Sequence, residues 1–64
     1  MSFRAERHGP FVVVRDIEGR KHALRGNAII GVTETDGDES ALVLQGGRLL
    51  LVDASLEEVI AWFV

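Results

Sequence analysis

The sequence predicts an α+β domain that is mainly β: a five-stranded antiparallel meander, curved or closed into a partial barrel, followed by one C-terminal helix. Three observations predict this fold. Short segments rich in aliphatic and β-branched residues recur along the chain. Turns containing glycine separate most of these segments, as expected between neighbouring antiparallel strands. Near the C-terminus, a Ser-x-x-Glu motif opens a stretch with helical apolar spacing.

The first ten residues show little apolar periodicity. We therefore expect residues 1–10 to form an N-terminal arm or an edge addition to the sheet, and residues 11–64 to form the single domain. The predicted strands are residues 11–16, 20–24, 28–35, 41–44 and 49–52. Glu18-Gly19 is the expected turn of the first hairpin, which places Asp16 opposite Lys21. Gly31 is a candidate bulge within the third strand.

The hairpin of residues 41–52 is the clearest structural signal. Gly46 and Gly47 are expected to be its two turn residues, because consecutive glycines reach the positive φ angles of two-residue hairpin turns. This register places four leucines on one face of the hairpin and four other aliphatic residues on the opposite face. Both faces are then apolar, and one short helix covers only one of them. We therefore expect the uncovered face to bind another subunit; its candidate residues are Ala41, Val43, Leu50, Val52 and Trp62.

The C-terminal helix is expected to begin after Ser55. Ser55 and Glu58 form a capping box, in which each side chain accepts a hydrogen bond from the backbone N–H of the other residue. The spacing of Leu56, Val59, Ile60 and Phe63 predicts one apolar stripe facing the sheet. Trp62 lies beside this stripe, where it either completes the core or projects into a partner.

Composition limits how such a small chain can be stabilised. Its 64 residues include no cysteine and only two histidines, so we expect neither disulfides nor a metal centre. Burial is limited at this size, which leaves association into a dimer or higher oligomer as a source of stability. We see no signal sequence and no apolar run near the roughly 18 residues of a membrane span, so we expect a cytoplasmic protein without membrane insertion.

Charge is distributed unevenly along the chain. Residues 1–25 contain six basic and three acidic side chains, for a balance of +3; residues 26–64 contain one arginine and seven acidic side chains, for a balance of −6. The basic part either is an ordinary solvated surface or steers an anionic partner. Four of its residues form a candidate basic edge for nucleic acid, and they are Arg15, Arg20, Lys21 and Arg25.

We find no pattern typical of catalysis. Ser55 is explained by helix capping, and neither His8 nor His22 has a nucleophile or second histidine close in sequence. The acidic stretch Asp36–Glu39 fits a turn, and it lacks the ligand spacing of a calcium-binding loop. We therefore expect a protein without enzymatic activity and without a cofactor.

Several segments resemble the small flagellar FlbD family, also called SwrD. They are Gly19-Arg20-Lys21-His22-Ala23-Leu24, then Ile29 or Ile30, then residues 42–52, and Ser55-Leu56-Glu57-Glu58-Val59-Ile60. The resemblance implies a cytoplasmic accessory protein that supports bacterial motility, and it carries no catalytic residues. The family usually has Pro-Asp-Thr where Thr35-Asp36-Gly37-Asp38 stands here, and the arm before Phe11 is extra. A fainter likeness to LytTR-type DNA-binding domains covers the strands and the Ser-Leu-acidic helix start, without that family's following basic segment.

Together these observations predict a bacterial protein–protein interaction module that self-associates. Another protein is a further candidate partner. The alternative function is a small nucleic-acid-binding regulator that uses the basic edge of the sheet.

Overall fold

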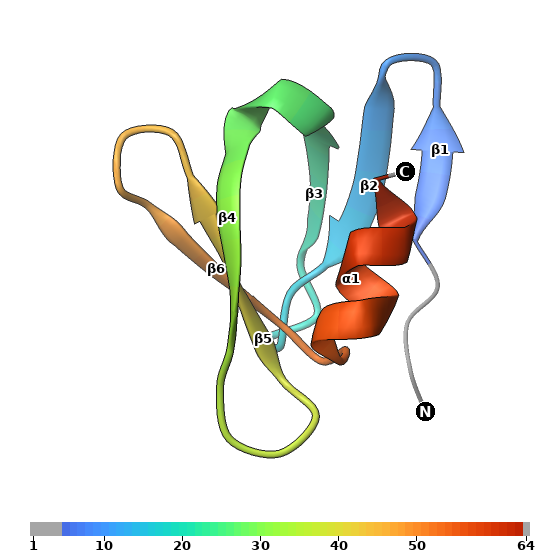
Figure 1. The fold of residues 1–64 in the computed structure, drawn as a ribbon. Helices are drawn as coiled ribbons and strands as arrows, with labels where there is room; N and C mark the ends of the chain where they lie inside the picture. Colours follow the sequence, from blue (N-terminus) through green and yellow to red (C-terminus); the bar gives the residue numbers. More distant parts are fainter. Residues whose placement is uncertain (1–4, 64) are drawn as a thin grey trace.

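The computed structural model describes residues 5–63, and the first four residues of the expected arm lie outside this range. The chain is mainly β with one C-terminal helix, as the sequence predicts (Figure 1). The elements are β1 (Glu6–His8), β2 (Phe11–Arg15), β3 (Lys21–Arg25), a 3₁₀ turn η1 (Gly26–Ala28), β4 (Ile29–Glu34), β5 (Ser40–Leu44), β6 (Leu49–Val52) and α1 (Leu56–Trp62).

The strands form two three-stranded antiparallel sheets, with the orders β1-β2-β3 and β4-β5-β6. The prediction of one five-stranded meander is therefore wrong, and the described strands do not close a barrel. Two features explain the difference. Glu6–His8, within the expected arm, pairs with β2 as an edge strand. The η1 turn separates β3 from β4, so these consecutive strands lie in different sheets.

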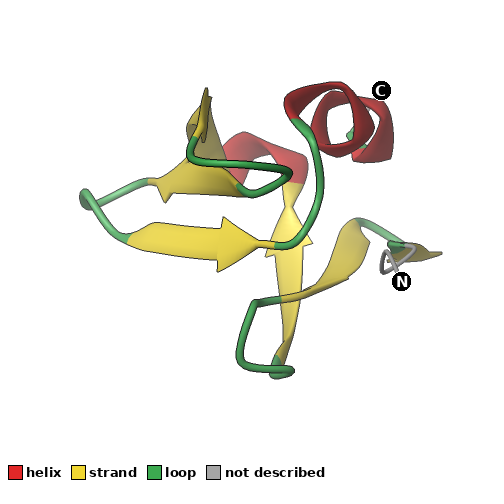
Figure 2. Ribbon diagram, turned by 90° about the horizontal axis from the view of Figure 1, so that it is seen from below, coloured by secondary structure: helices red, strands yellow, loops and turns green. Residues whose placement is uncertain are grey.

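The two sheets meet where β2 ends. Asp16 forms an isolated antiparallel bridge with Val52, and the Ile17 N–H donates to the Leu51 carbonyl at 3.0 Å. This junction connects the turn after β2 to one end of β6. α1 lies to one side of the paired sheets (Figures 1 and 2).

The β2–β3 hairpin has a three-residue loop instead of the expected two-residue turn. The Asp16 N–H donates to the Arg20 carbonyl at 2.9 Å, which closes the loop around Ile17, Glu18 and Gly19. Gly19 has a φ of 88°, as in three-residue loops where a glycine follows a tight turn. Lys21 therefore pairs with Arg15, and the predicted pairing of Lys21 with Asp16 is wrong by one residue.

The β5–β6 hairpin departs from the prediction in the same way. The Leu44 N–H donates to the Arg48 carbonyl at 2.8 Å, which leaves Gln45, Gly46 and Gly47 in the loop. Both glycines adopt positive φ, 87° and 82°. The register is displaced by one residue, and Leu42 pairs with Leu50.

This displacement changes which side chains share a face, because the side-chain period of a strand is two. Leu42, Leu50 and Val52 now face the interior, whereas Ala41, Val43, Leu49 and Leu51 lie on the opposite face. The predicted self-association face is therefore wrong as a set. Leu50 and Val52, with 9% and 0% exposure, are core residues. Only Ala41 and Val43 share the opposite face, and Ala41 is buried there.

The core forms between the inner faces of the two sheets. The buried hydrophobic residues are Val12, Val14, Leu42, Leu50, Val52, Ala54 and Val59, with Ala41 buried outside this cluster. Ser40 is also fully buried, and its hydroxyl donates to the Ala54 carbonyl at 2.8 Å. A buried hydroxyl would be costly without a partner, so this bond makes the position tolerable. One subunit therefore builds a core without a second chain.

The helix begins as predicted. Ser55 Oγ accepts from the Glu58 N–H, and the Glu58 carboxylate accepts from the Ser55 N–H, both at 3.2 Å. Val59 is fully buried, but Ile60 is 54% exposed, so the predicted stripe is narrower than expected. Trp62 is partly buried against the core, and it is not on the outer face of β5–β6. Its carbonyl accepts from the Arg7 guanidinium at 3.1 Å, which ties β1 to the end of α1.

Candidate interaction surface

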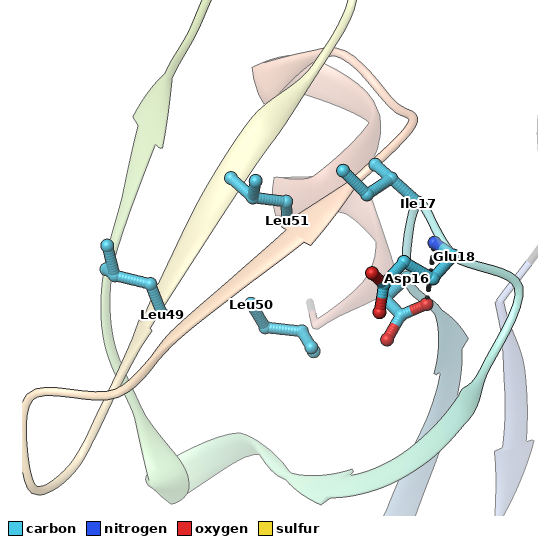
Figure 3. Close-up of a pocket in the computed structure, with 6 residues that line it drawn as sticks. All are labelled: Asp16, Ile17, Glu18, Leu49, Leu50 and Leu51. Atoms are coloured by element: carbon cyan, nitrogen blue, oxygen red, sulfur yellow. Dashed lines mark hydrogen bonds between the residues drawn. The ribbon is translucent and has the colours of Figure 1, made fainter.

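The outer face of β5–β6 carries aliphatic side chains in contact with water. Leu49 is 65% exposed and Leu51 36% exposed, and they pair with Val43 and Ala41 respectively. In Figure 3, Leu49 and Leu51 extend from one side of β6 and Leu50 extends from the other. Isolated exposed leucines are normal on protein surfaces, so what matters is whether these are contiguous with other apolar residues.

A shallow depression of about 250 Å³ joins these leucines to the turn after β2. Its lining residues are Asp16, Ile17, Glu18, Leu49, Leu50 and Leu51, as shown in Figure 3. Ile17 is 46% exposed and is held here by the hydrogen bond from its N–H to the Leu51 carbonyl. We define the leucine surface as Ile17, Val43, Leu49 and Leu51. It combines two segments that are more than 20 residues apart in the sequence.

One wall of the depression is fixed by Asp16. Its carboxylate accepts from the Glu18 and Arg20 N–H groups, both at 2.9 Å, and lies 2.8 Å from His22 Nε2. The hydrogen bond from His22 lowers the pKa of Asp16 below its ordinary value of 3.8. Desolvation opposes this change, while the two backbone N–H groups and the charge of His22 add to it. Asp16 therefore orders the loop that presents Ile17.

This role of Asp16 differs from the one that the sequence predicts. The sequence predicts Asp16 opposite Lys21, and it indicates for His22 only that no nucleophile or second histidine is close in sequence. A usable signal was present in Asp16-Ile17-Glu18-Gly19, because aspartate favours the first position of a type I turn and glycine the fourth.

The candidate basic residues lie mainly on the outer face of β1–β2–β3. Arg15 pairs with Lys21, and Phe11 pairs with Arg25, on the face opposite the buried Val12 and Val14. The Arg25 guanidinium lies 5.4 Å from the centre of the Phe11 ring, within cation–π range. The fourth candidate, Arg20, lies outside β3 in the turn, 3.8 Å from the Glu18 carboxylate. Arg15, Lys21 and Arg25 thus share one face of this sheet, and Lys21 and Arg25 also lie on its edge strand, β3.

Within residues 5–63, no three His, Asp or Glu side chains are grouped closely enough to hold a metal ion. The acidic stretch Asp36–Glu39 forms a loop in which Gly37 has a φ of 69°. Across the same range, no helix combines the length and apolarity needed to cross a bilayer.

Comparisons with protein-family models, with curated proteins and with solved structures found no match to this chain. The fold and the surface define a small two-sheet β domain with a C-terminal helix. The resemblance to the FlbD family stays a prediction.

Proposed function

We propose that this protein is a small, non-enzymatic interaction module that self-associates through the leucine surface. One observation carries the proposal. Of the six large hydrophobic residues that are exposed within residues 5–63, three line the same depression: Ile17, Leu49 and Leu51. Contiguous apolar patches are typical of protein interaction sites, and covering this one removes it from water.

We expect self-association to be less obligatory than the sequence predicts. The displaced register supplies Leu50 and Val52 to the core, so the subunit shelters part of the hairpin by itself. Association is therefore not required to complete the core. We expect a folded subunit that forms a dimer reversibly, and the FlbD-like resemblance makes motility support its candidate cellular role.

Sedimentation equilibrium over a wide concentration range tests the proposal. We expect the average mass to rise from that of one chain towards that of two as concentration increases, because association depends on mass action. Circular dichroism should remain unchanged across the series. A single-chain mass up to millimolar concentration would refute self-association as the function.

A second candidate function has its own support in the arrangement of Phe11, Arg15, Lys21 and Arg25. A sheet face that combines an aromatic ring with cationic side chains suits single-stranded nucleic acid, which binds by stacking and phosphate contacts. The acidic balance of residues 26–64 weighs against broad binding of polyanions. We therefore rank this function second.

Fluorescence anisotropy of a labelled single-stranded oligonucleotide tests this second function. If it holds, binding should appear at low salt, weaken steeply as salt rises and be lost when Lys21 and Arg25 are both changed to glutamate. The control is Arg48→Glu, which changes a charge outside this face. Absence of binding at low salt would remove the candidate.

A further inference from the structure

The hydrogen-bonding pattern of β6 leaves backbone groups directed away from β5. In antiparallel strands, residue pairs that exchange hydrogen bonds alternate with pairs that do not. The Leu44–Arg48 bond therefore places Leu42 and Leu50 in a bonded pair. The N–H and C=O groups of Leu49 and Leu51 must then point towards the other edge of β6, and the bond from Ile17 to the Leu51 carbonyl agrees.

That edge is occupied along only part of its length. Asp16 and Ile17 cover it beside Val52 and Leu51. Within residues 5–63, no backbone segment pairs with Leu49 on this side. The depression lies where the covering segment ends and the open edge begins.

The β3 and β4 edges carry features that disfavour strand addition, and the open part of β6 does not. β4 has a bulge between Ile29 and Gly31, and bulges blunt an edge. β3 presents Lys21 and Arg25, which would lie close to like charges in a symmetric pair. Leu49–Val52 has no charge, proline or bulge. An unprotected edge of this kind is a template for another strand.

We infer that β6 pairs antiparallel with β6 of a second copy of this chain, about a two-fold axis at Leu49. The inference rests on the proposed self-association and specifies that the two β6 edges join, which places the Leu49 side chains of the two subunits side by side within the leucine surface. The result joins the two β4-β5-β6 sheets at β6, with two backbone hydrogen bonds between Leu49 and Leu49 of the partner subunit. The pairing stops before Leu51, whose carbonyl already accepts from the Ile17 N–H. A two-fold contact of this type is self-complementary, and it closes at a dimer.

Charge complementarity favours a second copy as the occupant. Arg48 is the only lysine or arginine in residues 26–64, and it directly precedes β6. In a pair centred on Leu49, Arg48 of the partner subunit lies opposite Leu50, beside the depression whose rim carries Glu18. The Glu18–Arg20 ion pair is highly exposed, so Glu18 can turn to a new cation at little cost. The two-fold axis repeats this contact.

Disulfide trapping tests the geometry, because the chain has no cysteine of its own. In a bonded antiparallel pair the Cα atoms lie about 5.5 Å apart, which is within disulfide range. We expect the Leu49→Cys variant to form a covalent dimer rapidly under mild oxidation. The control is Thr33→Cys, an exposed site on β4 at the other edge of the same sheet, and it should stay monomeric in the same assay.

Backbone methylation provides the second test, since a chain of this length can be made by chemical synthesis. N-methylation of Leu49 removes a donor that no bond within the subunit uses, so the fold should persist. We expect the dimer dissociation constant to rise at least about tenfold, because the symmetry repeats the lost hydrogen bond and brings two methyl groups into the contact. The control is N-methyl-Ala23, whose N–H points to the outer edge of β3 by the same alternation.

The outcomes separate this inference from the proposed function. A dimer that tolerates N-methyl-Leu49 and gives no rapid Leu49→Cys crosslink would overturn edge pairing while self-association stands. A monomer at every concentration would overturn both. Trapping at Leu49 together with a dimer weakened only by N-methyl-Leu49 would support the two-fold β6 pair.

Discussion

Asp16 shows how a single side chain determines the shape of the surface. Its carboxylate holds the loop through two backbone N–H groups and contacts His22, and the loop in turn presents Ile17. The pKa of Asp16 is lowered in the folded protein from its ordinary value of 3.8. Between the lowered pKa and pH 3.8, the native state therefore binds fewer protons than the unfolded state. The stabilisation is therefore present above pH 3.8 and is lost as pH falls through the lowered pKa.

The Asp16→Asn variant isolates this charge. Asparagine keeps an oxygen that accepts from the Glu18 and Arg20 N–H groups, but it carries no negative charge to interact with His22. We expect a lower urea midpoint than the natural chain at neutral pH, and we expect the two midpoints to converge below pH 3.8. A difference that is equally large under acidic and neutral conditions would show that the charge is not responsible.

At the scale of elements, the capping box of α1 was predictable because it is local. Ser55 and Glu58 are three residues apart, and both reciprocal bonds are present. The short helix depends on this cap and on the burial of Val59, since isolated helices of its length are marginal.

The contribution of the cap can be measured by changing Ser55. We expect Ser55→Ala to lower the free energy of unfolding by about 1 kcal/mol, because the Glu58 N–H loses its acceptor. Ser55→Asp is the matched control and should restore most of the loss, since aspartate is also a good N-cap. Urea denaturation gives both values. Equal losses for alanine and aspartate would contradict a capping role.

The hairpins show where prediction from the sequence stopped. Positive φ at both Gly46 and Gly47 suits a two-residue turn as well as the three-residue loop that forms, so glycine content does not select between them. The choice decides the register, and a displacement of one residue moves every side chain to the opposite face. The candidate face therefore retained Ala41 and Val43 and lost Leu50 and Val52 to the core.

At the scale of the whole molecule, the class of fold was predictable and the arrangement of its sheets was not. Strand composition and turn residues indicate a mainly β chain, but the separation of β3 from β4 depends on the path of η1. The leucine surface was equally unpredictable from the sequence, because Ile17 reaches Leu51 through a contact between the two sheets. Long-range contacts of this kind leave no periodic pattern in the sequence.

The same arrangement separates two surfaces of different chemistry. The outer face of β1–β2–β3 carries Arg15, Lys21 and Arg25, while the leucine surface is apolar. A self-associating subunit would leave the cationic face available, since the two lie on different sheets.

Sedimentation velocity of two matched variants tests whether the subunits form a dimer through the leucine surface. Leu49 and Ile60 are similarly exposed large aliphatic residues, but only Leu49 belongs to the leucine surface. Changing either one to lysine should alter the stability of the subunit by only about 0.5 kcal/mol or less, as is usual for exposed positions. At a concentration where the natural chain is a dimer, we expect Leu49→Lys to sediment as a monomer and Ile60→Lys as a dimer. Dimers of Leu49→Lys as stable as those of the natural chain would contradict dimer formation through the leucine surface.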